Sequence, residues 1–154
     1  MKKTTVFLSA LALALSVSSY GQTIKSGEKL IYSGSYNMSG LMTQLAQVTM
    51  EAETVSTAKN SYLHLSCQAA TYSKWDSFFK IRDLYESYVN PKNLKPSLYK
   101  RNISEGGYTK KEKYVFKNDG KTITSTMNKK NMPEKERTFN INPNSQDVLC
   151  FMYK

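Results

Sequence analysis

Hydrophobic and polar residues alternate along most of the chain from residue 28 to residue 141, the pattern of β-strands that bury one face. The alternation is clearest in 45–55, where Ala, Val and Met side chains point one way and Gln, Thr and Glu side chains point the other. We therefore expect a mainly β fold, either a curved antiparallel meander sheet or a partial barrel. The expected strands are 28–37, 45–55, 61–71, 81–89, 96–105, 108–118, 121–128 and 135–141.

Glycine pairs and one helical segment interrupt this alternation. Gly106-Gly107 and Asp119-Gly120 are expected to turn tight hairpins, because these residues adopt positive φ at little cost. Around Trp75 the apolar residues recur at helical spacing, and Ser73 is a residue type that caps helices. This predicts one short helix after the third strand, which we expect to bury Trp75 and Phe79 against the sheet.

A second helix is expected at the C-terminus. The strand pattern stops at 142–145, after which Ser145 or Asn144 is expected to cap a helix beginning at Gln146. No later element in the sequence covers the apolar face of this helix. We therefore expect the domain to be incomplete at its C-terminus.

Residues 1–21 have the pattern of an export signal. Lys2 and Lys3 precede an apolar run at 6–17, and small residues precede the expected cleavage site between Gly21 and Gln22. The run is shorter than the ~20 residues of a transmembrane helix, and no later stretch approaches that length. We expect one β-rich domain at 22–154, exported to the periplasm or the cell exterior, with no transmembrane segment in the mature chain.

Cys67 and Cys150 are the only cysteines. An oxidising compartment permits a disulfide between them, and the sequence does not exclude it. Each lies among apolar residues, however, so two small buried hydrophobic side chains are the favoured interpretation.

No catalytic, metal or cofactor signature accompanies these elements. His64 is the single histidine, which excludes a multi-His zinc site, and no G-x-S-x-G elbow supplies a nucleophile. Asp83 and Glu86 lie three positions apart in an expected strand, so they should point to opposite faces and form ordinary ion pairs rather than a catalytic pair. We predict no cofactor, no metal site and no enzymatic activity.

Aromatic residues near the expected first helix form one candidate site. They either fill the core, the commoner role in a small β domain, or line a groove in which lipid tails or an apolar partner segment would lie. The candidate ligand-binding residues are Trp75, Phe78, Tyr85, Tyr88 and Tyr99.

Positive charge forms the other candidate. The formal net charge is +10 at pH 7, and 92–137 carries 13 Lys and Arg residues against 5 acidic ones. Export makes nucleic acid an unexpected partner, whereas an anionic glycan or a lipid headgroup suits such a surface. Lysines that keep strand faces soluble are the simpler explanation. The candidate basic patch comprises Lys100, Arg101, Lys110, Lys111, Lys113 and Lys117.

Four segments stand out for their order along the chain: 27–32, 78–88, 105–108 and 147–149. Together they resemble a family of exported bacterial proteins known only by a domain of unknown function, number 3108. The resemblance implies a largely antiparallel β protein of the cell envelope with no assigned activity, usually longer at its C-terminus than this chain. We expect a non-enzymatic domain that binds an apolar or amphiphilic envelope component, such as a lipid or lipoprotein. The alternative is a basic adhesive module for an anionic glycan, another envelope polymer or a membrane surface.

Overall fold

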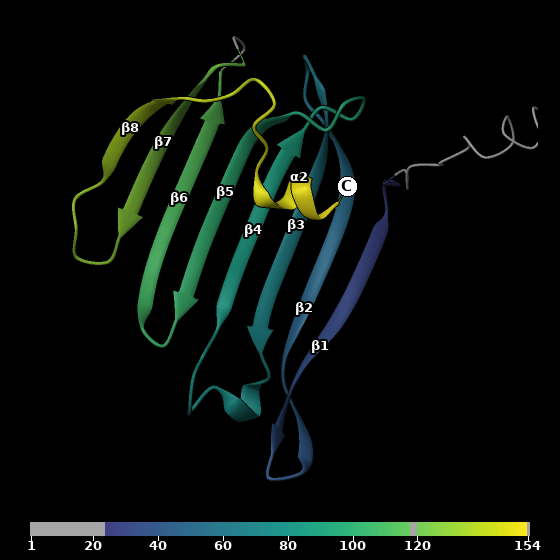
Figure 1. The fold of residues 1–154 in the computed structure, drawn as a ribbon, viewed down its shortest axis with the longest axis vertical. Helices are drawn as coiled ribbons and strands as arrows, with labels where there is room; N and C mark the ends of the chain where they lie inside the picture. Colours follow the sequence, from purple (N-terminus) through teal and green to yellow (C-terminus); the bar gives the residue numbers. More distant parts are fainter. Residues whose placement is uncertain (1–23, 118–119, 154) are drawn as a thin grey trace, which may run out of the picture.

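The computed structural model describes residues 24–117 and 120–153, which form a single antiparallel sheet of eight strands (Figure 1). The strand order in the sheet is the order along the chain, so each strand pairs with the strand that follows it. The sheet curves without closing, which confirms the mainly β class and the meander. The strands are β1 (Glu28–Met38), β2 (Leu41–Ser56), β3 (Ser61–Thr71), β4 (Arg82–Val89), β5 (Pro96–Glu105), β6 (Tyr108–Phe116), β7 (Thr122–Lys129) and β8 (Lys135–Asn140).

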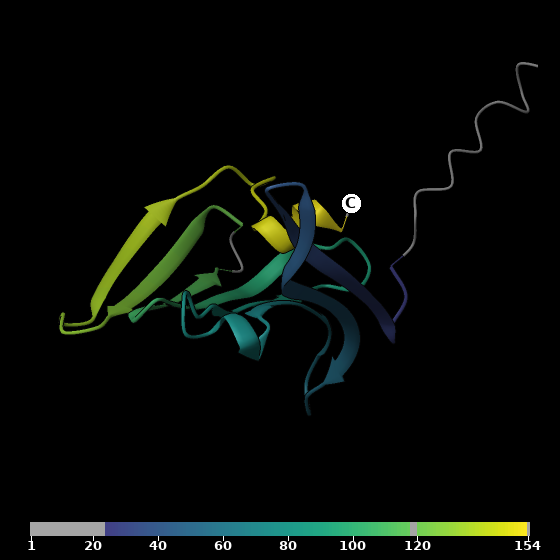
Figure 2. The ribbon, with the colours of Figure 1, turned by 90° about the horizontal axis from the view of Figure 1, so that it is seen from below.

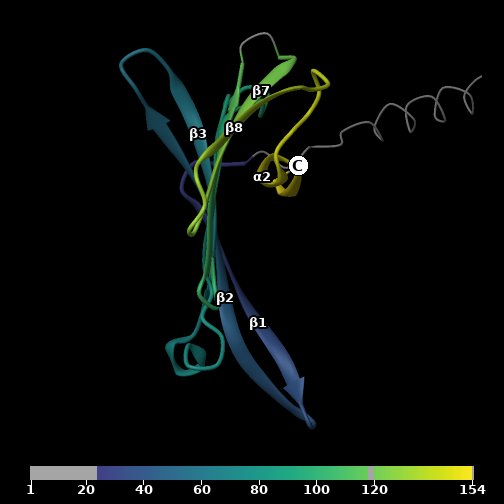
Figure 3. The same cartoon turned by 90° about the vertical axis from the view of Figure 1, so that its left-hand side faces the viewer.

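The sheet bends toward the side on which the C-terminal helix lies. Figure 2 shows β8 and the β1–β2 hairpin both rising on that side, and Figure 3 shows the same hairpin bending toward α2 (Val148–Met152). Alternate residues of the strands therefore form two different surfaces. We call the surface under α2 the helix-covered face, which includes Leu65 and Ser87, and the opposite surface the polar face, which includes His64 and Glu86.

The core lies between α2 and the centre of the helix-covered face. Leu65 and Val89 are fully buried there, and Leu149 and Cys150 of α2 are 1% and 0% exposed. Cys67 and Cys150 are both free and buried. This confirms their interpretation as small core side chains.

β2 begins four residues earlier than predicted, at Leu41. The pairing shifts between Gly34, which lies opposite Ala46, and Ser35, which lies opposite Gln44. Leu45 is thus an extra residue in β2, a β-bulge, and the bulge breaks the period of two that would have identified the start of the strand.

The helix after β3 is a single 3-10 turn, η2 (Ser73–Trp75). Tyr72 occupies its N-cap position and makes no side-chain cap, so the predicted capping role of Ser73 is wrong. The expected burial of Phe79 is also wrong, because its side chain remains 52% exposed, whereas Trp75 is half-buried.

The C-terminal helix is confirmed, but it begins two residues later than predicted, and its cap is Asp147 rather than Ser145 or Asn144. The Cys150 amide donates to Asp147 Oδ1 at 2.9 Å, and the Ser87 hydroxyl donates to Asp147 Oδ2 at 2.6 Å. The expected export signal lies outside the described residues. Within 24–117 and 120–153, no helix has both the length and the apolar character needed to cross a membrane.

Candidate functional site

An apolar groove of about 450 Å³ lies between β1, β2 and the β3–β4 connection. In Figure 1 this connection, which contains η2, lies at the end of the sheet away from α2. Three aromatic residues of the β3–β4 connection form one wall, and β1 and β2 form the other. Its lining is Gly34, Ser35, Tyr36, Leu45, Ala46, Thr71, Trp75, Phe78, Phe79 and Ile81.

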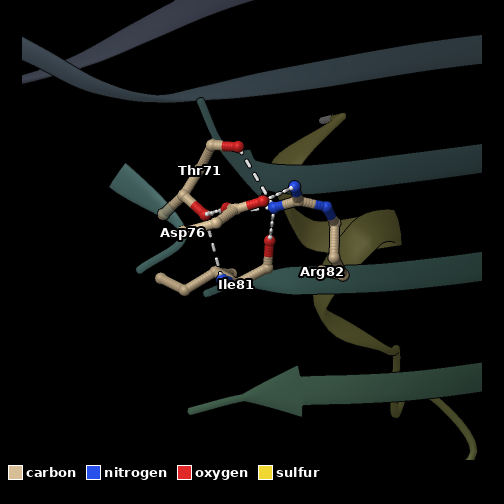
Figure 4. Close-up of polar contacts among 4 residues, drawn as sticks. All are labelled: Thr71, Asp76, Ile81 and Arg82. Carbon is tan, nitrogen blue, oxygen red and sulfur yellow. Dashed lines mark hydrogen bonds and ion pairs between the residues drawn. The ribbon is translucent and has the colours of Figure 1, made fainter. Parts of the chain in front are cut away.

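A polar network fixes the β3–β4 connection (Figure 4). Arg82 Nη2 donates to Asp76 Oδ2 at 2.5 Å, and the Thr71 hydroxyl donates to Asp76 Oδ1 at 2.7 Å. The same hydroxyl accepts the amide of Ile81 at 3.1 Å, and Arg82 Nη1 donates to the Ile81 carbonyl at 2.6 Å. The network thereby ties the end of β3 to the start of β4.

The charge of Asp76 is part of this network. The hydrogen bond from Thr71 and then that from Arg82 lower the pKa of Asp76 below its ordinary value. The carboxylate therefore stays ionised at neutral pH and keeps its bonds to both partners.

Trp75 is anchored to β2 through its indole. Nε1 donates to the carbonyl of Gln44 at 2.9 Å, next to the bulge at Leu45. The Phe78 ring lies 5.9 Å from the Trp75 ring in a tilted arrangement and is 81% exposed. The indole is thus held in place while its aromatic neighbour faces solvent.

Phe79 closes the groove against the β5–β6 turn. A Cβ on Gly106 would lie 2.7 Å from Phe79 Cε2, and Gly106 has a φ of 52°. Only glycine allows this ring to approach the turn so closely without strain. Gly106, which the sequence predicts to be part of a tight turn, therefore also allows Phe79 to pack at the edge of the groove.

Residues 32–154 match the family described as "Protein of unknown function (DUF3108)". The chain belongs to this family. No curated protein and no solved structure matches this chain. The DUF3108 match begins inside β1 and includes the groove lining, from Gly34 to Ile81.

The sheet separates the five aromatic candidates of this DUF3108 chain. Trp75 and Phe78 line the groove, whereas Tyr85 and Tyr99 lie on the helix-covered face. Tyr99 is 8% exposed, and burial raises the pKa of its hydroxyl strongly. Tyr88 lies on the polar face, where its ring stacks on His64 with 4.5 Å between centroids.

The six basic candidates are separated in the same way. Arg101 and Lys110 extend from the helix-covered face and form ion pairs with buried Glu112, at 2.9 Å and 2.7 Å. Lys100, Lys111 and Lys113 lie on the polar face, whereas Lys117 follows β6 and is exposed. The predicted patch is therefore two groups of different character plus one isolated lysine.

The carboxylates and the single histidine have structural partners. His64 Nε2 lies 3.1 Å from Glu86 Oε1 on the polar face, while Asp83 is buried and accepts the Ser104 amide at 2.9 Å. Asp83 and Glu86 thus face opposite ways. The charge of the neighbouring Asp83 instead raises the pKa of Glu105. The described part of the chain holds no cluster of three or more His, Cys, Asp or Glu suited to a metal ion.

Proposed function

We propose that this protein binds the hydrocarbon chain of an amphiphile in the groove beside η2. The observation that carries the proposal is the combination of an open apolar hollow of about 450 Å³ with Phe78, 81% exposed at its rim. Hollows of this size are typical of small-ligand sites, and clustered exposed apolar side chains mark binding surfaces.

The charges beside the groove favour an acidic headgroup. Lys74 Nζ lies 5.6 Å from the Trp75 ring, and Lys80 follows Phe79 directly. Among the described residues, neither lysine has a carboxylate within 4.0 Å. A fatty acid, or a lipid with an acidic headgroup, would place its tail along the aromatic wall and its charge near these lysines.

The groove is formed before any ligand arrives. The Asp76 network holds the connection, and the indole bond to Gln44 orients Trp75. A site whose walls are already ordered loses little conformational entropy on binding, so a modest apolar contact area suffices for measurable affinity.

The single tryptophan makes the test direct. Titration of the protein with dodecanoate below its critical micelle concentration should shift the emission of Trp75 to shorter wavelength and saturate. The variant Phe78→Ala should weaken binding by about tenfold, because it removes an aromatic contact worth about 1.5 kcal/mol. Its folding should be unaffected, since the side chain is 81% exposed.

The matched control is Phe151→Ala, which removes a similarly exposed ring, 76% accessible, from α2. It should bind dodecanoate like the unmodified protein. Emission that does not respond to the amphiphile would contradict the proposal, and so would an equal loss of affinity in both variants, because the groove would then play no special part.

A further inference from the structure

The polar face carries two adjoining hollows that no part of the proposed lipid site uses. One, of about 510 Å³, lies over β4 to β7, and the other, of about 390 Å³, lies over β1 to β4. They share Leu84 and Glu86 of β4. We call the two hollows together the polar strip, because it crosses the sheet from strand to strand.

The first hollow brings Lys100, Lys111 and Lys113 together, and its lining also includes the carboxylates of Glu86, Glu112 and Glu134. Lys100 lies directly opposite Lys113 in the β5–β6 pair, and Lys111 lies opposite Asn102. Like charges directly opposite each other destabilise a sheet. Within the part of the chain that the structure describes, Lys111 and Lys113 have no carboxylate within 4.0 Å.

The other face of the same two strands shows the contrast. There Arg101 and Lys110 share the buried carboxylate of Glu112. On the polar face Lys100 Nζ lies 3.9 Å from Glu86 Oε2, and Oε1 of the same carboxylate already contacts His64 at 3.1 Å. Lys111 and Lys113 of the strip are therefore left to attract an external anion.

The second hollow is lined by uncharged hydrogen-bonding groups as well as the Lys29–Glu51 ion pair. Its amides and hydroxyls come from neighbouring positions on β2 and β3: Gln47, Thr49, Ser66 and Gln68. Such groups match sugar hydroxyls, which both donate and accept. Leu84 is the only apolar residue in the lining of either hollow, so the strip lacks the apolar anchors that interfacial membrane binding uses.

We propose that the polar strip binds an acidic polysaccharide laid across the strands. Its anionic groups would meet Lys100, Lys111 and Lys113, and its hydroxyls would meet the amide and hydroxyl groups around Gln68. From β1 to β7 there are six strand spacings of about 4.8 Å, so the strip extends for roughly 29 Å, enough for several sugar units. This site is separate from the lipid groove.

The test uses oligosaccharides of polygalacturonate, with neutral dextran oligosaccharides for comparison, and calorimetric titration in about 0.15 M salt. Polygalacturonate should bind and dextran should not. The double variant Lys111→Gln/Lys113→Gln should weaken binding by roughly tenfold, equivalent to about 1.4 kcal/mol. Its control, Lys92→Gln/Lys95→Gln, removes the same charge from two exposed lysines of the β4–β5 loop and should change affinity less than about twofold.

Two further variants distinguish binding at the strip from general charge attraction and from binding in the lipid groove. Gln68→Ala should weaken polygalacturonate binding by roughly threefold while leaving its salt dependence unchanged, because it removes a neutral contact. Phe78→Ala should bind the oligosaccharide normally, so failure of the lipid proposal would leave this result intact. Equal losses in the two lysine double variants, or equal binding of polyphosphate or of phosphatidylglycerol vesicles, would overturn the proposal in favour of unspecific charge attraction.

Discussion

Asp147 joins α2 to the sheet, and its replacement by alanine tests whether this small helix is held by the contacts described. The residue is 8% exposed, and Cys150 contacts both of its carboxylate oxygens, through its amide on Oδ1 and through its thiol, at 3.2 Å, on Oδ2. Oδ1 caps the helix by accepting the Cys150 amide, while Oδ2 accepts the hydroxyl of Ser87, which is fully buried on β4. The variant therefore removes a cap and a tertiary hydrogen bond together.

The expected size follows from these two losses. Removal of an N-cap costs about 1 kcal/mol, and loss of a buried hydrogen bond to a charged group costs about 1.5–3 kcal/mol. Asp147→Ala should therefore lower the free energy of unfolding by about 3 kcal/mol, which corresponds to a fall in Tm of roughly 10 °C. Asp147→Asn keeps a residue that can cap the helix, so its free energy of unfolding should fall by about 1–2 kcal/mol less than that of Asp147→Ala.

Urea unfolding followed by circular dichroism measures these differences in the free energy of unfolding. A double-mutant cycle then shows how much of the loss comes from the hydrogen bond between Ser87 and Asp147. Ser87→Ala is the second mutation, and its coupling energy with Asp147→Ala should be about 1–2 kcal/mol, since each variant deletes the same bond. A loss below about 0.5 kcal/mol in Asp147→Ala, or a coupling energy near zero, would refute the account of how α2 is attached.

Three further changes test the rest of the fold. Gly106→Ala should destabilise the protein by about 2 kcal/mol, since its Cβ would clash with the Phe79 ring, whereas Gly107→Ala, with open space around it, should lose only about 1 kcal/mol by thermal unfolding. Glu112→Gln should lose about 2 kcal/mol in urea unfolding because two cations lose their shared carboxylate, and unchanged stability would contradict the pairing. The depressed pKa of Asp76 means that its contribution is complete above about pH 4 and is lost as pH falls through the folded-state pKa, so tryptophan emission should be constant from about pH 5 to 8 and change only in acid.

The strands can be predicted from the sequence because their signal is local. Period-two alternation places β3 and β5 at their observed bounds, and the glycines at 106–107 mark the turn that joins β5 to β6. The prediction of strand bounds fails where a residue interrupts the alternation. The bulge at Leu45 shifts the phase of β2, and no pattern within 41–45 indicates it.

The site depends on partners that are distant in sequence. Trp75 and Phe78 can be identified because they cluster along the chain, but Tyr36 and Leu45 reach the groove only through the β1–β2 hairpin. The cap of α2 escapes prediction for a related reason. Ser145 and Asp147 are both suitable capping residues, and what selects Asp147 is a hydroxyl 60 positions earlier in the chain, on β4.

For the basic patch, the sequence predicts more than the clustering of lysines and arginines along the chain: it also predicts which of them pair across β5 and β6. A two-residue turn at 106–107 sets Glu105 opposite Tyr108, and counting back from that pair places Lys100 opposite Lys113 and Arg101 opposite Glu112. The turn signal and the strand period together therefore separate the cations that have a carboxylate partner from those that do not. Because the two groups of cations lie on opposite faces of the same hairpin, charge substitutions on the two faces should change different properties: affinity on the polar face and stability on the helix-covered face.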